Sequence, residues 1–308
     1  MRSFKNFGFH AVAWALLCFS SIHGSLSVYA AADTNVKSIF LFKDVLQSNT
    51  TALKTSGFDT LVIFRIGVLA NGDLVYYSTG DAGEAVDAPV VTNGSYIGGT
   101  ALADKIQSFK TGKTNIDRVE VSLVSHDTTF QNIRDLIGAT GTGADTVLYR
   151  NFQALKTAWD LDAFNNDDEG VYHVSSTVSF AQMLGTIGYQ YSIAPYTNSG
   201  FWANFKRQID AAAPGLFDRV YLQVYDGGAS NNPGTWQNTL GMKVIPLVWV
   251  INDAKPSQGT TAAQAQQRFA NWYSQYEVAG GGYWNDYDIE KMDSSYTDYA
   301  GALAAVFQ

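Results

Sequence analysis

The feature that most constrains the fold is a strand-like pattern that recurs eight times along the chain. Short runs rich in β-branched and aromatic residues alternate with longer, more polar segments. The runs are 37–44, 59–68, 117–126, 158–167, 189–196, 218–227, 243–252 and 280–288. Several of them are apolar almost throughout, as is typical of strands buried on both faces of a parallel sheet.

Segments between these runs carry apolar residues at helical spacing. The spacing predicts amphipathic helices at 100–110, 129–138, 264–276 and 298–307. Strand–helix alternation repeated eight times over roughly 250 residues predicts an α/β fold, a single (β/α)8 TIM barrel. An open doubly wound sheet is the alternative reading of the same alternation.

Two connections depart from a simple barrel. The link 45–57 is short for a crossover helix, whereas the second connection is long. An Asn-Gly pair in 71–78 predicts a β-hairpin inserted after strand 2. The Gly-, Thr- and Asn-rich stretch 80–99 is expected to be a surface loop.

The first thirty residues have the composition of a secretory signal peptide. Arg2 and Lys5 precede an apolar run that is too short to favour a permanent membrane span, and Val28 and Ala30 suit a cleavage site. An uncleaved N-terminal anchor is the alternative. We therefore expect a signal peptide at 1–30, a single catalytic domain at 31–308, and a secreted protein, extracellular or periplasmic.

Charge and cysteine content narrow the function classes. Loss of Arg2 and Lys5 takes the formal net charge from -8 to -10, which disfavours nucleic acid and anionic membranes as partners. The single cysteine, Cys18, lies in the predicted signal peptide, so no disulfide is expected. Only His126 and His173 remain in the mature chain, which disfavours a histidine-rich metal site. Aromatic residues make up 14% and suit a neutral ligand with flat faces, such as a sugar.

The segment 160–170, DLDAFNNDDEG, places five carboxylic acids at the end of the fourth predicted strand. Active sites of barrels form at this end of the strands. Side chains alternate along a strand, so one face carries every second residue of this segment. That face presents Ala163, Asn165, Asp167 and Glu169. Adjacent carboxylates in a confined pocket raise one pKa, which favours Glu169, the outermost, as a general acid beside Asp167.

Other readings of the acidic segment remain open. A calcium loop is one, although Phe164 occupies a ligand position and no glycine follows, which breaks the EF-hand pattern. A solvated acidic turn is another, although Trp159 and Leu161 favour a buried strand. Asp160, Asp162 and Asp168 fall outside the catalytic face and are expected to be structural. The glycine-rich segment 138–146 follows a predicted helix, which argues against phosphate binding.

Residues 162–169, DAFNNDDE, resemble the D-x-x-D-x-D-x-E signature of glycoside hydrolase family 18, the chitinases and endo-β-N-acetylglucosaminidases. The ending DDE is especially similar to the endo-β-N-acetylglucosaminidase branch. Four further segments are similar to strand motifs of the family: 122–126, 193–196, 221–226 and 280–288. The sequence departs from the signature at two positions, with Asn165 in place of the middle aspartate and Ala163 in place of a glycine.

The resemblance implies a substrate-assisted retaining mechanism without metal or cofactor. Glu169 would protonate the glycosidic oxygen, and the 2-acetamido carbonyl of the substrate would attack. Asp167 would orient the acetamide N–H, and the Tyr225 hydroxyl would bond its carbonyl oxygen. Further substrate-binding residues implied are Asn165, Trp284, Gln223, Trp249, Tyr196 and Ser125, and His126 could line the site.

Two function classes remain from the sequence. The first is an enzyme that cleaves β-1,4 bonds next to N-acetylglucosamine, in chitin oligomers or the N-glycan core. The second is a non-catalytic family-18-like lectin or inhibitor. Retention of Asp167 and Glu169 favours the enzyme. Asn165 leaves room for the lectin, because Asn can hydrogen-bond Asp167 but cannot hold a proton. We expect a monomer.

Overall fold

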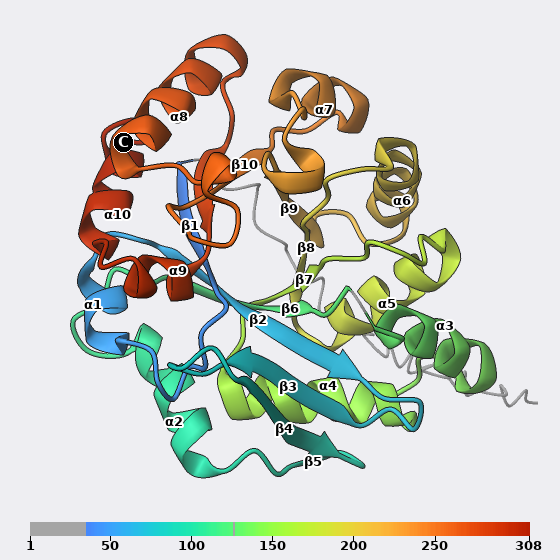
Figure 1. Cartoon of the computed structure of the whole chain (residues 1–308). Helices are drawn as coiled ribbons and strands as arrows, with labels where there is room; N and C mark the ends of the chain where they lie inside the picture. Colours follow the sequence, from blue (N-terminus) through green and yellow to red (C-terminus); the bar gives the residue numbers. More distant parts are fainter. Residues whose placement is uncertain (1–34, 126) are drawn as a thin grey trace, which may run out of the picture.

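A ring of eight parallel strands forms the centre of the molecule (Figure 1). The computed structural model describes residues 35–125 and 127–308. The predicted signal peptide and His126 lie outside the described residues. The ring contains β1 (Val36–Leu41), β2 (Thr60–Val68), β6 (Arg118–Leu123), β7 (Ala163–Asn166), β8 (Gln190–Ile193), β9 (Phe217–Gln223), β10 (Ile245–Trp249) and β11 (Gly280–Trp284). It closes because β1 pairs in parallel with both β2 and β11. The predicted (β/α)8 barrel is therefore confirmed, and the open sheet is excluded.

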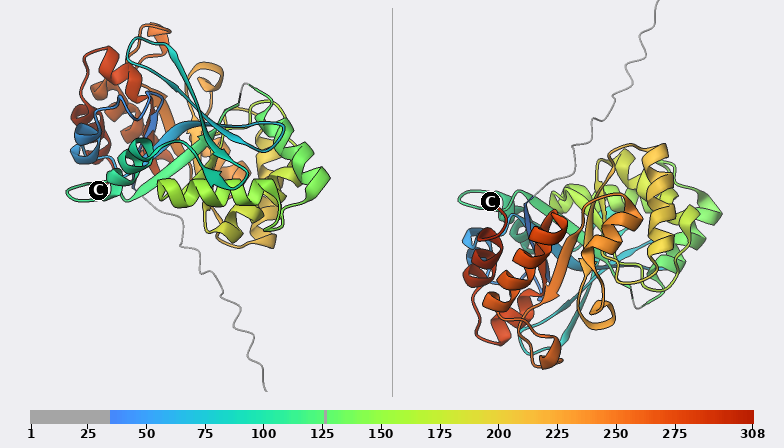
Figure 2. Two further views of the ribbon diagram at one scale, coloured as in Figure 1. Left: turned by 90° about the horizontal axis from the view of Figure 1, so that it is seen from below. Right: turned by 90° about the horizontal axis from the view of Figure 1, so that it is seen from above.

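Helices surround this ring in both views of Figure 2. The α-helices are α1 (Thr50–Thr55), α2 (Thr100–Gln107), α3 (Thr129–Thr140), α4 (Val147–Trp159), α5 (Val174–Ile187), α6 (Ser199–Ala212), α7 (Pro233–Leu240), α8 (Ala262–Tyr276), α9 (Asp286–Lys291) and α10 (Tyr296–Ala304). Short 3₁₀ turns are η1 (Ser108–Lys110), η2 (Asp226–Gly228) and η3 (Pro256–Gln258). The four helices predicted from apolar spacing correspond to α2, α3, α8 and α10.

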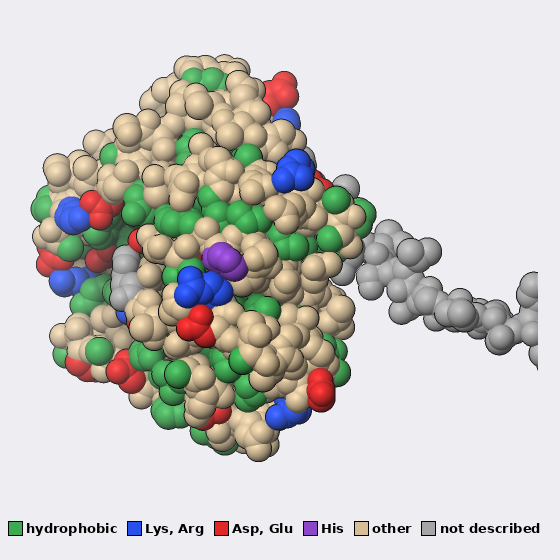
Figure 3. Space-filling model, turned by 90° about the vertical axis from the view of Figure 1, so that its right-hand side faces the viewer, with side chains coloured by type: hydrophobic (Ala, Val, Ile, Leu, Met, Phe, Trp, Pro, Cys, Tyr) green, Lys and Arg blue, Asp and Glu red, His purple; other side chains and the backbone are tan. Residues whose placement is uncertain are grey.

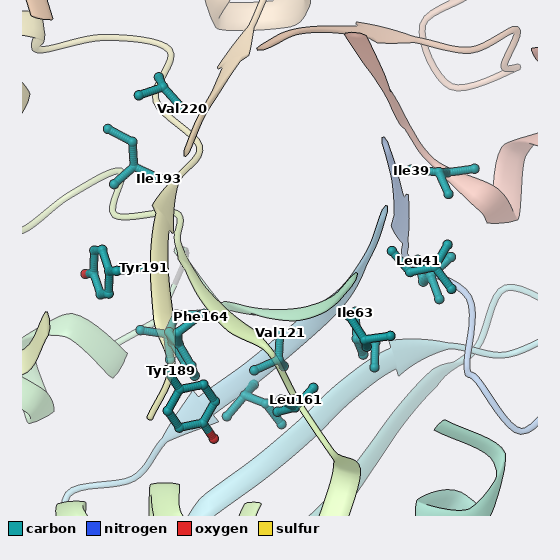
Figure 4. Close-up of a cluster of buried hydrophobic side chains, with 14 of the residues drawn as sticks. Ile39, Leu41, Ile63, Val121, Leu161, Phe164, Tyr189, Tyr191, Ile193 and Val220 are labelled. Atoms are coloured by element: carbon teal, nitrogen blue, oxygen red, sulfur yellow. The ribbon is translucent and has the colours of Figure 1, made fainter. Parts of the chain in front are cut away.

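The barrel wall separates two kinds of side chain. Ile39, Ile63 and Val121 are fully buried and point away from the enclosed space, toward the helices (Figure 4). The inner face instead carries a small apolar cluster and several fully buried polar groups. Gly282 permits the close approach of β11 and β1, since a Cβ there would lie 2.1 Å from the Ser38 hydroxyl. Polar residues inside the barrel are thus held by an apolar shell outside it.

The insertion after β2 is larger than the sequence predicts. Strand β3 (Leu74–Thr79) pairs antiparallel with the end of β2, so the predicted hairpin is present. Two more strands follow, β4 (Ala85–Thr92) and β5 (Ser95–Tyr96), each antiparallel to the one before. The expectation of a surface loop at 80–99 is therefore wrong. Val90 and Val91 are fully buried in the core, which supplies the apolar contact that a loop would lack.

The fourth predicted strand begins later than expected. Residues 158–159 close helix α4, and Asp160 ends it in the left-handed conformation with φ 50°. Trp159 is fully buried and packs edge-on against Tyr76 of β3, with ring centroids 5.7 Å apart. The apolar residues Trp159 and Leu161 that indicate a strand thus belong partly to the helix that precedes it. Strand β7 proper covers the four residues beneath the acidic cluster.

Charges are dispersed over the surface that Figure 3 shows. Basic and acidic side chains lie singly or in small groups among uncharged ones on this face, without a basic patch. No helix within residues 35–125 or 127–308 combines the length and apolar character needed for a membrane span.

Candidate active site

A cleft of about 330 Å³ opens at the carboxyl ends of the ring strands. Its lining comes from six of the ring strands or the loops that follow them and from the segment after β7. The lining residues are Phe40, Phe64, Asp167, Glu169, Ala194, Tyr196, Gln223, Tyr225, Asp226, Gly227, Leu247, Trp249 and Trp284. The cleft therefore combines two neighbouring carboxylates with an aromatic wall, in the position where barrel enzymes place their catalytic groups.

Gln223 links the two carboxylates at the floor of the cleft. Its side-chain Nε2 donates to Asp167 Oδ1 at 3.1 Å and to Glu169 Oε1 at 3.3 Å. The same nitrogen donates to the Ala194 carbonyl oxygen at 2.8 Å, which fixes the amide orientation. Asp167 is 6% exposed, whereas Glu169 is half-buried at the entrance. Strand alternation correctly predicts that both carboxylates face the cleft, with Glu169 outermost.

The environment of Asp167 disfavours its charged form. Burial raises the pKa of this carboxyl well above its ordinary value, and the neighbouring Glu169 and Asp168 carboxylates raise it further. Arg65 and the Ser125 side chain lower it. The sequence predicts a raised pKa for Glu169, and in the structure burial raises the pKa of its neighbour Asp167.

Aromatic rings form the wall opposite the carboxylates. Trp284, at the end of β11, packs edge-on against Phe64, with 4.7 Å between ring centroids. It also contacts Phe42 in a tilted arrangement at 5.3 Å. Trp249, at the end of β10, donates from Nε1 to Asp288 Oδ2 at 2.7 Å, which fixes its ring. A sugar ring entering this cleft would meet rigid apolar faces, because each indole is held by neighbours.

Tyr225 follows β9 and lies against Trp249, with ring centroids 6.0 Å apart. Burial raises the pKa of its hydroxyl well above the ordinary value, and the Asp167 and Glu169 charges add to this effect. The phenol therefore stays protonated over the whole physiological range and can serve as a hydrogen-bond donor at the cleft.

Asn165 lies one step below the cleft and is fully buried. Its Oδ1 accepts from Ser122 Oγ at 2.9 Å, and its Nδ2 donates to Ser192 Oγ at 2.9 Å. These serines project inward from β6 and β8, the two strands beside β7. The amide is therefore held by serines, whereas the sequence suggests Asp167 as its partner. Asn165 is absent from the cleft lining, and Ser125 also lies outside it.

The other acids of the segment have structural partners, as strand alternation predicts. Asp160 and Asp162 both pair with Lys110, at 3.1 and 2.9 Å. The Asp168 carboxylate accepts backbone N–H groups of Gly170, Val171 and Tyr172 at 2.8–3.0 Å and so shapes the loop after β7. Among the described residues, no group of three or more His, Cys, Asp or Glu side chains could hold a metal ion.

The structure brings most of the predicted site residues together. The cleft lining includes Asp167, Glu169, Tyr225, Trp284, Gln223, Trp249 and Tyr196. Sequence reasoning missed Phe40, Phe64 and Leu247, which point inward from β1, β2 and β10. Alternate residues of a strand point inward, so these three residues could be predicted once one inward-facing residue of each strand is known.

Solved structures of family-18 glycosidases share this fold. A fungal endo-β-N-acetylglucosaminidase from glycosyl hydrolase family 18 aligns with a TM-score of 0.62 at 11% identity, covering 88% of this chain and 98% of that one. A chitinase from Bacteroides thetaiotaomicron aligns with a TM-score of 0.59 at 12% identity, covering 91% and 97%. A class V chitinase from Nicotiana tobaccum, in complex with NAG4, aligns with a TM-score of 0.55 at 9% identity, covering 89% and 100%.

No protein-family model and no curated protein sequence matches the chain. At these low identities the structural likeness shows the fold alone. The resemblance to family 18 that the fourth-strand motif indicates is confirmed at the level of the fold.

Proposed function

We propose that the protein is a glycoside hydrolase that cleaves β-1,4 linkages next to N-acetylglucosamine by a substrate-assisted retaining mechanism. The observation that carries the proposal is the Asp167–Gln223–Glu169 arrangement at the floor of an aromatic cleft. A buried carboxylate beside a more exposed one is the pair that this mechanism needs, one to orient a nucleophile and one to donate a proton.

Glu169 acts as the general acid in this proposal. It stands at the cleft entrance, where a glycosidic oxygen can reach it, and it gives its proton to the leaving oxygen as the bond breaks. The acetamido carbonyl of the sugar attacks the anomeric carbon from the opposite side, which forms a cyclic oxazolinium ion. An attached nucleophile can lower the barrier by up to ~7–11 kcal/mol in ideal intramolecular cases. Water then opens the ring, and Glu169 takes up the proton of that water.

Asp167 accepts the acetamide N–H and stabilises the positive charge of the oxazolinium ion. It must be ionised for both tasks, although its burial favours the neutral form. Asp167 and Glu169 lie close enough to titrate together, so the pair holds one proton jointly at intermediate pH. Binding of an acetamide N–H favours ionised Asp167 and places that proton on Glu169, where catalysis requires it.

The remaining cleft residues orient the sugar. Tyr225 donates its hydroxyl proton to the acetamido carbonyl oxygen, which holds that oxygen toward the anomeric carbon. Trp284 supplies a flat apolar face beneath the sugar ring. Trp249, at the end of β10, and Tyr196, after β8, also line the cleft. We also propose that the protein is secreted, on the basis of the signal-like composition of residues 1–30.

A turnover assay with a matched control tests the proposal. Wild type is incubated with fluorogenic N-acetylglucosamine oligomers and with a high-mannose N-glycan, alongside Glu169→Gln and Glu84→Gln. Removal of a general acid lowers rates by about 10²–10⁴-fold. We expect that loss for Glu169→Gln only, because Glu84 is exposed in the insertion. If wild type binds these glycans but does not cleave them, the enzyme proposal is wrong and the protein is a lectin.

A further inference from the structure

The loop that follows β1 packs against the aromatic wall of the cleft, which Trp284 and Trp249 form. Its first residue, Phe42, contacts the Trp284 ring in a tilted arrangement, with 5.3 Å between centroids, and the Phe64 ring at 6.0 Å. Trp284 and Phe64 line the cleft, and Phe42 lies outside the lining. Phe42 also packs edge-on against Tyr287 of α9, at 6.2 Å. It therefore supports two cleft rings without itself meeting the cleft.

One carboxylate holds the backbone of this loop. Asp286, in the first turn of α9, accepts the Phe42 backbone N–H at 2.6 Å and the Lys43 backbone N–H at 2.9 Å, both at Oδ1. Its Oδ2 accepts from the Ser48 hydroxyl at 3.4 Å. Asp286 is fully buried, so it satisfies these N–H groups where bulk water does not reach. The position of Phe42 is therefore tied to α9.

Strand β3 of the insertion holds the same loop through other backbone groups. The Phe42 carbonyl oxygen accepts from the Thr79 N–H at 3.1 Å, and the Asp44 N–H donates to the Thr79 carbonyl oxygen at 2.8 Å. The N–H groups of Phe42 and Lys43 point to Asp286 instead. Asp286 is thus the partner that completes the hydrogen bonding of this part of the loop.

The position of Asp286 in the sequence connects it directly to the aromatic wall. It lies two residues after Trp284, the last residue of β11, where α9 begins. The same turn of helix holds the other indole of the wall, because Trp249 Nε1 donates to Asp288 Oδ2 at 2.7 Å. Residues 286–288 therefore fasten both the loop after β1 and the end of β10.

We propose that Asp286 is a positioning residue of the aromatic wall. It keeps the loop after β1 in place, so that Phe42 stays against Trp284 and the indole presents one fixed face to a sugar ring. A platform that is already ordered loses less conformational entropy on binding than a mobile one. Asp286 does not line the cleft and acts through Phe42. The effect on glycan binding rests on the proposed function, whereas the support of Trp284 is a property of the free protein.

Fluorine NMR of protein labelled with fluorotryptophan tests the support of Trp284 without any ligand. The Trp284 signal is assigned by its loss in Trp284→Phe. Asp286→Ala leaves two N–H groups of the loop without their acceptor, so we expect the Trp284 signal to shift or broaden. Asp286→Asn keeps the Oδ1 acceptor, so we expect the signal to return toward its wild-type position.

Asp218→Ala is the matched control for the loss of a buried aspartate. Asp218 pairs with Arg118, and its side chain is 8% exposed. It lies at the start of β9, whereas Gln223, at the other end of this strand, lines the cleft. This variant should lose stability but leave the Trp284 signal unchanged. Thermal unfolding of every variant shows the temperature range in which it is folded.

Calorimetric binding of chitotetraose tests the consequence for the proposed site. A Glu169→Gln background prevents turnover during the measurement. A well-placed aromatic contact contributes up to about a factor of ten in affinity. We expect Asp286→Ala to raise Kd by about that factor, Asp286→Asn to restore most of the affinity, and Asp218→Ala to leave Kd unchanged. With Glu169 present, Asp286→Ala should raise KM and leave kcat nearly unchanged.

Each outcome decides one part of the inference. A Trp284 signal that stays unmoved in folded Asp286→Ala overturns it, and an equal displacement in Asp218→Ala does the same. If Asp286→Ala does not fold, Phe42→Ala removes the supporting ring alone, and an unmoved signal there overturns the inference.

A moved Trp284 signal together with a weaker Kd supports the inference, whereas a moved signal with an unchanged Kd overturns the consequence for binding. If wild type neither binds nor cleaves glycans, the proposed function is wrong. The fluorine signal then still decides whether Asp286 positions Trp284.

Discussion

Two buried carboxylates inside the barrel, Glu120 and Asp167, have opposite surroundings. Glu120 on β6 is fully buried and accepts from Arg118 Nε at 2.8 Å and from the Tyr221 hydroxyl at 2.6 Å. Ser192 also donates to it. Asp167 is almost as buried, but its hydrogen-bond donor from β9, Gln223, is shared with Glu169 and a backbone carbonyl. Glu120 thus has three side-chain hydrogen-bond donors, whereas Asp167 shares its one donor from β9.

This difference in hydrogen bonding assigns a structural role to Glu120 and a chemical role to Asp167, although both lie inside the barrel. A buried charge with complete hydrogen bonding fixes the surrounding strands. A buried charge with incomplete compensation has a displaced pKa and is available for proton chemistry. A hydrogen-bonded chain joins Glu120 to Asn165, which lies two residues before Asp167, since Ser192 accepts from Asn165 and donates to Glu120. Glu120 and its partners Arg118, Tyr221 and Ser192 form a compensated cluster deep in the barrel. The catalytic cluster of Asp167, Glu169 and Gln223 lies above it, at the cleft.

The largest expected effect is on stability at the compensated cluster. Replacing Glu120 by Gln leaves the buried Arg118 guanidinium without the charge that Glu120 provides. Removal of one partner of a buried ion pair typically costs about 3–5 kcal/mol of unfolding free energy. Denaturant unfolding of Glu120→Gln measures this loss, and Glu277→Gln, at an exposed pair with Lys243, should lose less than about 1 kcal/mol. Equal losses in the two variants would contradict the assignment.

The opposite result is expected at the catalytic cluster. Asp167→Asn should lower kcat by about 10²-fold or more, within the range for groups that stabilise charge at the reacting centre. It should also raise the free energy of unfolding at neutral pH. Each unit of pKa displacement corresponds to about 1.36 kcal/mol. Parallel assays of turnover and denaturant unfolding measure both changes. If the variant loses both activity and stability, Asp167 has a structural role like that of Glu120.

The sign of the pH dependence follows from the raised pKa of Asp167. A carboxyl with a higher pKa in the folded than in the unfolded protein holds more protons when folded. Its contribution to stability is fully present below the unfolded pKa and is lost as pH rises through the folded value. Subtracting the stability curve of Asp167→Asn from that of wild type should show this decline with rising pH. A difference that increases with pH would contradict the raised pKa.

A smaller effect is expected where the two clusters meet. Asn165→Asp removes the N–H that donates to Ser192 and places a second carboxylate near Glu120. Ser192 cannot donate its single proton to both. An unsatisfied buried group costs about 1–3 kcal/mol, which thermal unfolding should detect. We expect turnover to remain unchanged or to fall. A higher kcat in this variant would mean that Asn165 marks a declining site.

The sequence predicts the barrel well because its signal is repeated eight times, so an error in one strand does not alter the topology. The insertion was underestimated for a physical reason. Strand β4 (AVDAPVVT) contains Pro89, which cannot donate to a strand ladder, and lacks a regular apolar–polar alternation. It forms a strand because β3 and α4 lie beside it. The start of β7 was misplaced because Trp159 packs equally well from a helix.

The site was predictable where a side chain's place follows from strand alternation alone. Asp167 and Glu169 follow directly from the phase of β7. The role of Asn165 could not be predicted in this way. The partners of Asn165 come from two neighbouring strands, which depends on register.

The most direct test of the account is the anomeric configuration of the first product. Wild type is mixed with chitotetraose and with a high-mannose N-glycan, and ¹H NMR records the new reducing end before mutarotation. Attack by the substrate's own acetamido group, with proton donation by Glu169, predicts that the β-anomer forms first. Initial formation of the α-anomer would mean direct attack by water and would contradict the roles assigned to Asp167 and Glu169.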